Sequence, residues 1–209
     1  TLSLNNGIIY RNIQNIGRQR GEQYILENLG LDNLITYRAI EFTDILCSRD
    51  DSPFKDRISY YGNDKKKYHF IKDVDMITII KQFYTKYVAI RELDRIIYDF
   101  IIYWNAVKKI FSICYENNDA YSLFDYAGIY VFSLLFVDID DVITEKTREN
   151  YIKYLSKLNE ITDKHPQIMF RTSINVDLWK KQKENAIFNT RNPQILNYLY
   201  YNLKKKMGL

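Results

Sequence analysis

The feature that most constrains the fold is a long stretch, from about residue 73 to residue 115, that contains neither glycine nor proline. Apolar residues such as Met76, Ile80 and Phe83 recur in it about every 3.5 positions, the spacing of one helix face. Others, such as Phe100, widen the stripe beyond the narrow seam of a coiled coil. We therefore predict a mainly α protein, a helical bundle around a long central helix at about 73–115, and favour this over an exposed dimer zipper.

Signals elsewhere in the chain predict further helices. Residues 8–29 have helical apolar spacing interrupted by Gly17 and Gly21, which predicts one broken helix or two short ones. The last helix should begin with Asn192 as its N-cap and Pro193 at its first position. Its lysines at 204–206 would lie at the negative end of the helix dipole.

One segment favours β-structure. Residues 57–61 and 68–71 are short, aromatic and partly alternating, and Gly62-Asn63-Asp64 between them suits a turn. We predict a small β-hairpin near 57–71. At 209 residues the chain suits a single helical domain, 1–209, and an N-terminal helical subdomain at 1–50 stays open.

Composition bounds the setting in which the protein works. Hydrophobic residues make up 46% of the chain, which is too many for it to stay disordered. The 19 tyrosines, with many Ile, Asn and Lys residues, indicate an AT-rich genome: a virus, mobile element, parasite or AT-rich bacterium. Two cysteines, Cys47 and Cys114, lie in apolar helical patterns, which favours buried thiols and an intracellular, cytoplasmic location. The N-terminus lacks a signal-peptide pattern, and we interpret the apolar run at 120–137, which contains Asp125, as core and not as a membrane span.

The sharpest chemical string is Leu-Leu-Phe-Val-Asp-Ile-Asp-Asp-Val at 134–142. It resembles the first motif of the haloacid dehalogenase phosphatase superfamily, an apolar strand followed by Asp-x-Asp. The resemblance implies Asp138 as the nucleophile that accepts the phosphoryl group, Asp140 as the general acid and Mg²⁺ as cofactor. A cation is needed because a carboxylate that attacks a phosphate dianion is otherwise repelled.

The rest of that family's pattern is incomplete. Thr172 stands where the second motif would be, but Arg171 interrupts the strand-like run before it, and Lys180 or Lys181 is a nominal third motif. No acidic pair follows to complete a magnesium site. The acids suit equally well the end of a buried segment and the start of a polar connection.

The histidines and cysteines do not form a metal pattern. His69 and His165 lie far apart, and neither has a cysteine or second histidine at zinc-ligand spacing. We therefore expect no metal site and no cofactor, with Mg²⁺ needed only under the phosphatase interpretation.

Basic clusters are the candidates for contact with nucleic acid. If they converge on one face they would bind phosphates, and if they do not they are solvated surface. They are Arg11, Arg18, Arg20, Lys65, Lys66, Lys67, Lys180, Lys181, Lys183, Lys204, Lys205 and Lys206.

Two hypotheses on function follow. The first is a non-enzymatic helical interaction module that binds a protein partner or, as the second choice, nucleic acid. The alternative is an Mg²⁺-dependent phosphate-transfer or hydrolytic enzyme that uses Asp138 and Asp140. The alternative requires the segment before Asp138 to be a strand, so the secondary structure of residues 128–137 distinguishes the two.

Overall fold

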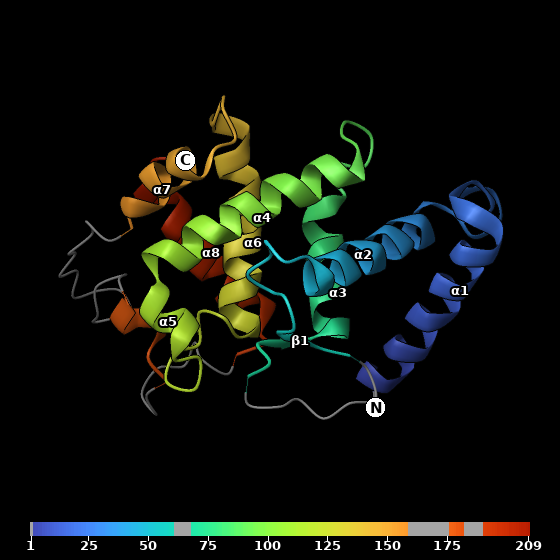
Figure 1. Ribbon diagram of the computed structural model, residues 1–209, viewed down its shortest axis with the longest axis horizontal. Coiled ribbons are helices and arrows are strands. Elements are labelled where there is room, and N and C mark those ends of the chain that lie inside the picture. Colours follow the sequence, from blue (N-terminus) through green and yellow to red (C-terminus); the bar gives the residue numbers. More distant parts are fainter. Residues whose placement is uncertain (1, 61–67, 159–175, 182–189) are drawn as a thin grey trace. The chain divides into compact units, whose positions relative to one another are not determined.

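The computed structural model describes residues 2–60, 68–158, 176–181 and 190–209. In these ranges the chain forms eight α-helices, one short 3-10 helix and a pair of very short strands (Figure 1). The mainly α prediction is confirmed. In chain order the elements are α1 (Leu2–Leu29), α2 (Leu31–Ser48), β1 (Ile58–Ser59), β2 (Ile71–Lys72), α3 (Asp73–Tyr84), α4 (Leu93–Ile110), α5 (Ser112–Glu116), α6 (Tyr126–Val142), α7 (Arg148–Ser156), η1 (Val176–Trp179) and α8 (Pro193–Met207).

The stretch from 73 to 115 is mostly helical, but it is divided into α3, α4 and α5. Turns at 85–90 separate α3 from α4, and Phe111, between α4 and α5, has non-helical angles of φ −109° and ψ 42°. Tyr87 is buried in the first connection, whereas Ile90, which fits the same apolar period, is 72% exposed. Three shorter helices thus replace the single long one, because apolar periodicity continues through a turn when the helices on both sides face a core.

The contacts within the chain gather in two compact units, Thr1–Tyr98 and Asp99–Leu209. The division falls within α4, so the beginning of this helix belongs to the first unit and the rest to the second. The first unit extends well past the subdomain proposed at 1–50. The prediction of a single domain over 1–209 stays a prediction.

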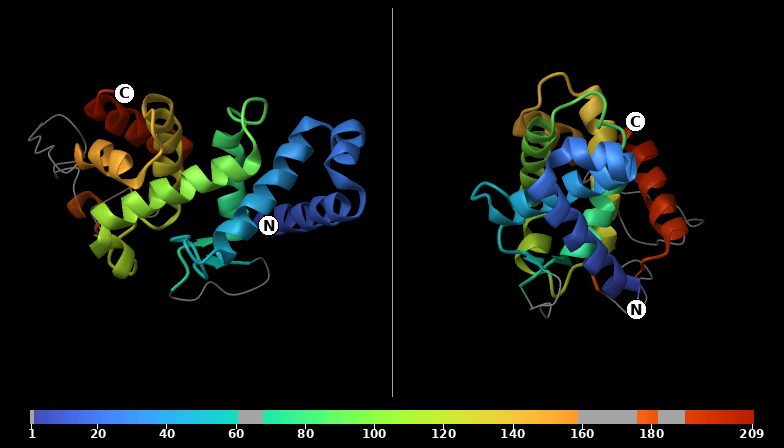
Figure 2. Two further views of the ribbon diagram at one scale, coloured as in Figure 1. Left: turned by 45° about the horizontal axis from the view of Figure 1, so that its top comes forward. Right: turned by 90° about the vertical axis from the view of Figure 1, so that its right-hand side faces the viewer.

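In the first unit, the chain turns after α1, and α2 packs back along it (Figure 2). The predicted interruption is a kink at Gly21, whose φ of 82° is strained for residues with a side chain. Gly17 is required for a different reason: a Cβ added there would lie 2.1 Å from a ring carbon of Tyr37 on α2. The absence of a side chain at Gly17 therefore lets the two helices approach closely.

The two strands of the first unit pair in parallel, with Ile58 opposite Ile71 and Ser59 opposite Lys72. The predicted β-hairpin is therefore wrong, since the strands of a hairpin run antiparallel. The alternating aromatic pattern marked where extended chain occurs. It carried no information on strand direction.

The core of the second unit is aromatic. Trp104 of α4 is fully buried, with its ring centroid 5.7 Å from that of Phe124 and 6.2 Å from that of Phe132 on α6. Phe100 and Phe136 make a further edge-to-face pair at 5.2 Å, one of the favoured geometries for aromatic rings. The apolar run at 120–137 is thus core, as its composition predicted.

Helix α8 packs against α6 in the second unit. Its start is as predicted: the Asn192 side chain accepts a hydrogen bond from the backbone N–H of Gln194 at 2.9 Å, and Pro193 occupies the first turn. Both cysteines, Cys47 and Cys114, are buried free thiols. In the described parts of the chain, no helix combines the length and the hydropathy needed to cross a membrane.

Candidate anion-binding pocket

A concave site of about 290 Å³ lies in the second unit, where α4 ends. Helix α4 contributes Lys108 and Lys109, and α7 contributes Arg148. The remaining lining residues, all polar, are Asn105, Ser112, Tyr115 and Glu116. The lining therefore combines three cations with one carboxylate.

The break at Phe111 shapes this site. Phe111 is fully buried, and its non-helical backbone ends α4 and redirects the chain into α5. The turn places the Tyr115 ring under the Lys108 ammonium, with Nζ 4.0 Å from the ring centroid, while Phe124 packs on Tyr115 at 5.1 Å. A cation over an aromatic face is attracted by the ring quadrupole, so this contact orients Lys108 without neutralising its charge.

The three cations of the pocket have no carboxylate within ion-pair distance among the residues that the structure describes. Lys109 and Arg148 are exposed, and Lys108 is half-buried. Glu116, the one carboxylate in the lining, forms no ion pair with them. Positive charge in this concave site therefore remains available to an anion from outside.

Other lysines of the second unit are already neutralised. Lys146 pairs with Asp140 at 3.1 Å, Lys181 with Asp125 at 2.6 Å and Lys204 with Asp138 at 2.7 Å. The pocket thus differs from these sites in the one property that matters for ligand binding, which is uncompensated charge.

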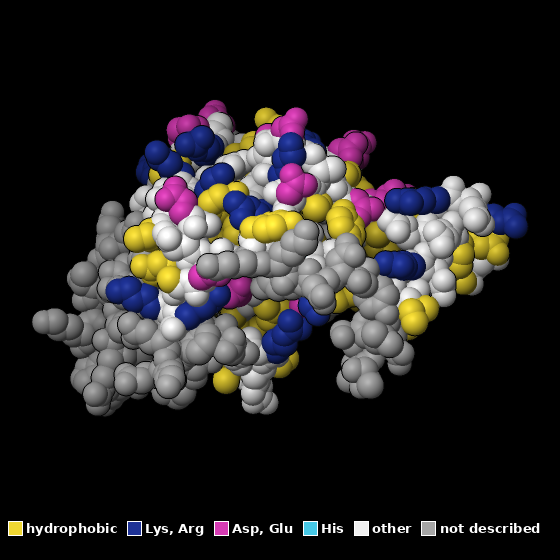
Figure 3. Space-filling model, turned by 60° about the horizontal axis from the view of Figure 1, so that its bottom comes forward, with side chains coloured by type: hydrophobic (Ala, Val, Ile, Leu, Met, Phe, Trp, Pro, Cys, Tyr) yellow, Lys and Arg dark blue, Asp and Glu magenta, His cyan; other side chains and the backbone are white. Residues whose placement is uncertain are grey.

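Among the described residues, the predicted basic candidates are considered within each unit separately. In the first unit, Arg18 lies 3.6 Å from Asp44, and the Arg20 guanidinium lies 5.8 Å from the centroid of the Tyr24 ring. Lys65, Lys66, Lys67 and Lys183 lie outside the described residues. On the face of the molecule that Figure 3 shows, the Lys and Arg side chains lie singly or in small groups, interspersed with acidic and apolar side chains.

The candidates of the second unit lie at opposite ends of α6. Lys181 pairs with Asp125, just before α6, and Lys204 pairs with Asp138 near its end. These two aspartates are separated by about 20 Å along the helix, at a rise of about 1.5 Å per residue. Lys180 takes part in an isolated bridge with Tyr121, while Lys205 and Lys206 lie in the last turn of α8.

The segment before Asp138 is helical and not a strand, since α6 runs from Tyr126 to Val142. The phosphatase resemblance requires a strand there, so its structural condition is not met. The reason is that Leu135 to Val137 belong to a helix that is buried on most sides, and a short apolar run does not by itself distinguish helix from strand.

Asp138 and Asp140 also fail to converge. Residues two apart on a helix do not face each other. Asp138 accepts hydrogen bonds from Tyr200 and from Lys204 of α8. Asp140 is fully buried and accepts a 2.9 Å bond from the Tyr151 hydroxyl. Burial and then the Asp138 carboxylate raise the pKa of Tyr200 above its ordinary value. Each aspartate therefore holds a different helix or loop in place.

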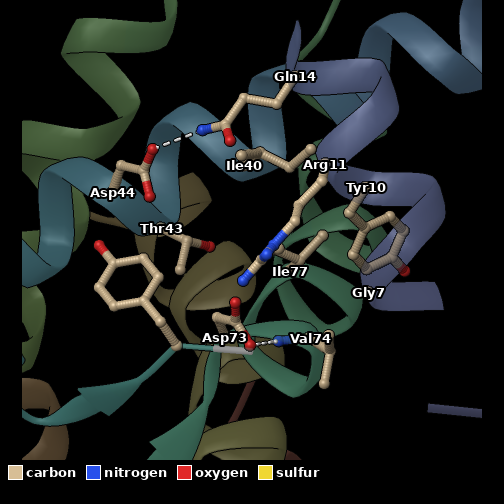
Figure 4. Close-up of a pocket in the computed structure, with 11 residues that line it drawn as sticks. Gly7, Tyr10, Arg11, Gln14, Ile40, Thr43, Asp44, Asp73, Val74 and Ile77 are labelled. Carbon is tan, nitrogen blue, oxygen red and sulfur yellow. Dashed lines mark hydrogen bonds between the residues drawn. The ribbon is translucent and has the colours of Figure 1, made fainter. Parts of the chain in front are cut away.

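A second, smaller cavity of about 70 Å³ lies in the first unit between α1, α2 and α3. Figure 4 shows Arg11 pointing into it toward Asp73, and Gln14 donating a hydrogen bond to Asp44 at 2.8 Å. Burial raises the pKa of Asp44 above its ordinary value. Since polar groups of α1 reach carboxylates of the neighbouring helices here, we interpret the cavity as part of the contact that holds α1.

Known proteins offer no guide to the site: no family model, no curated protein and no solved structure matches this chain.

No group of three or more His, Cys, Asp and Glu side chains suited to a metal ion occurs in the described part of the chain. His69 packs edge-on against Tyr68, with ring centroids 4.3 Å apart, and His165 lies outside the described residues.

The three cations of the pocket are not among the basic candidates predicted from the sequence. The Lys108-Lys109 pair is visible in the sequence, but it lies within the predicted long helix and was not considered as the end of a helix. The signal that was present is a lysine pair directly before an apolar Ile-Phe, where a helix could end. Arg148 carried no such signal, because only the packing of α7 brings it to the end of α4.

Proposed function

We propose that this protein is a non-enzymatic helical interaction module that binds an anionic partner through the pocket of Lys108, Lys109 and Arg148. The observation that supports the proposal is the uncompensated charge of these side chains in a concave site. Anionic segments of a nucleic acid or of an acidic protein both suit such a site. The helices serve as the scaffold that holds the three cations together.

The carboxylates that suggested catalysis have structural roles in this proposal. Asp138 is engaged by α8 and Asp140 by Lys146 and Tyr151. Turnover of a phosphate ester by the purified protein with Mg²⁺, lost in an Asp138→Asn variant that stays folded, would contradict the non-enzymatic proposal.

Binding is tested with two labelled probes, an oligonucleotide that carries a 5′-phosphate and polyglutamate, by fluorescence anisotropy. We compare the wild type with a Lys108→Gln, Lys109→Gln, Arg148→Gln triple variant. We expect at least one probe to bind the wild type and the triple variant to bind it at least about tenfold more weakly. If the oligonucleotide is the ligand, the negative slope of log affinity against log salt should become shallower by about 2 to 3 in the triple variant, since each phosphate contact contributes about 0.7 to 0.9.

The matched control is Lys205→Gln. Lys205 is exposed in the last turn of α8, as Lys109 is in the last turn of α4, but it does not line the pocket. An equal loss in Lys205→Gln and in Lys109→Gln alone would show that net charge, and not the pocket, governs binding. Absence of binding to either probe would refute the proposal.

A further inference from the structure

The charge of the pocket matches one class of anion. Three cations and Glu116 leave a net charge of two positive units in the lining. A phosphate monoester carries about −1.5 to −2 at neutral pH and has three strong acceptor oxygens. A diester, as in a nucleic-acid backbone, carries one negative charge per phosphate. A monoester therefore offsets the charge of the lining and a single diester does not.

The donors of the pocket also suit a terminal phosphate. Arg148 carries a fork of N–H donors, and the two lysine ammonium groups and the Ser112 hydroxyl are further donors in the lining. These groups come from α4, α5 and α7, so they surround a concave volume and do not form a linear track. Such an arrangement fits one compact group better than a row of backbone phosphates.

Helix electrostatics separates the lysines from Arg148. Lys108 and Lys109 lie in the last turn of α4, where the helix dipole itself favours cations. Arg148 is the first residue of α7, where the dipole disfavours a cation. Helix stability therefore accounts for the lysines but not for Arg148, and an anion held between α4 and α7 accounts for all three.

We infer that the pocket of Lys108, Lys109 and Arg148 recognises a phosphate monoester dianion. The inference rests on the proposed function and specifies its ligand. The group is the same on a mononucleotide, on a phosphorylated side chain or at the end of a nucleic acid.

The test uses three probes that share one nucleoside: adenosine monophosphate, cyclic adenosine monophosphate and adenosine. They carry a monoester, a diester and no phosphate. Titrations of the full chain are followed by the amide and arginine side-chain resonances in nuclear magnetic resonance spectra. We expect the monoester to bind at least about tenfold more tightly than the diester, and adenosine not to bind. The affinity for adenosine monophosphate should rise as the pH increases through the second phosphate pKa of about 6.

Arg148→Gln and Lys109→Gln should each weaken binding of the monoester about tenfold, whereas Lys205→Gln should leave it unchanged. All three positions are exposed, so the variants are expected to fold, and their spectra check this directly. Phosphoserine serves as a second monoester. Equal binding of phosphoserine shows that the phosphate alone is read, weaker binding shows a nucleotide preference, and both support the inference.

Equal affinity for the monoester and the diester, or no effect of Arg148→Gln, would overturn the inference. This failure is distinct from failure of the proposed function. If the triple variant loses oligonucleotide or polyglutamate binding but the monoester is not preferred, only the phosphate-monoester inference falls. If no probe binds, both fall.

Discussion

Replacing Lys146 by methionine tests the role assigned to the buried acid on α6. Asp140 is fully buried, and the side chain of Lys146, 11% exposed, pairs with it at 3.1 Å and also donates to its backbone carbonyl. Methionine keeps the apolar stem but removes the ammonium group. Leaving a buried charge without its partner costs about 3–5 kcal/mol. Because Tyr151 still donates to Asp140, we expect a loss near the lower limit, about 3 kcal/mol.

Tryptophan fluorescence gives a selective measurement of this loss. The chain has two tryptophans, Trp104 and Trp179, and both are buried in the second unit. Urea unfolding followed by tryptophan emission therefore reports the unit that contains Lys146. The free energy of unfolding is obtained by linear extrapolation to water.

The partner variant makes the test specific. Asp140→Asn retains an acceptor for the Tyr151 hydroxyl, and it leaves Lys146 close enough to the surface to reach water. It should therefore be less destabilising than Lys146→Met, and the double variant should be more stable than Lys146→Met alone. A Lys146→Met variant within about 1 kcal/mol of the wild type would refute the reasoning, since that is the range of an exposed ion pair.

Three further measurements test the first unit and the buried thiols. Gly17→Ala should destabilise the protein by about 1–3 kcal/mol in urea unfolding followed by circular dichroism, because the new methyl group would overlap the Tyr37 ring; a stabilised variant would contradict this. Burial raises the pKa of the Cys114 thiol to about 12, so a thiol reagent should label it only as fast as the protein opens; rapid labelling of the native protein would be inconsistent. Since the pKa of Asp44 is raised in the folded state, its contribution to stability is lost as pH rises from its ordinary value of 3.8 through the folded pKa. Asp44→Asn should flatten that part of the melting-temperature profile, and an unchanged slope would show that Asp44 is not the cause.

The parts of the fold that the sequence predicted are those set by local chemistry. An asparagine followed by proline and a regular apolar stripe defines α8, because the cap and the face are properties of one short segment. The kink at Gly21 was predicted for the same reason, since glycine tolerates the backbone angles found there. Both features depend on neighbouring residues in the chain alone.

The parts that were missed depend on packing between segments. Periodicity did not detect the turns at 85–90, because apolar residues continue at helical spacing through Tyr87 and Ile90, although Ile90 is exposed. Strand direction was missed because Ile58 and Ile71 look the same in either orientation. For similar reasons no pattern linked Arg148 to Lys109, which lies far from it in the chain.

A candidate anion-binding site in this chain is distinguished by basic side chains that form no ion pair with a carboxylate, and not by the number of basic residues. Runs of lysine in the sequence were the predicted phosphate contacts, yet Lys181 and Lys204 form ion pairs with aspartates at the two ends of α6. Such pairs hold helices together, and their charge is not available to a ligand. Lys108 and Lys109 were less conspicuous, but neither forms an ion pair with a described carboxylate, and α7 adds a third cation to the same pocket. A cation that forms no ion pair in a concave site is solvated at little cost while the site is empty, and it gains most when an anion replaces the water. This difference predicts that charge removal at Lys204 lowers stability, whereas charge removal at Lys109 lowers binding and costs no more than the about 0.3–1 kcal/mol that a cation contributes at an exposed helix C-terminus.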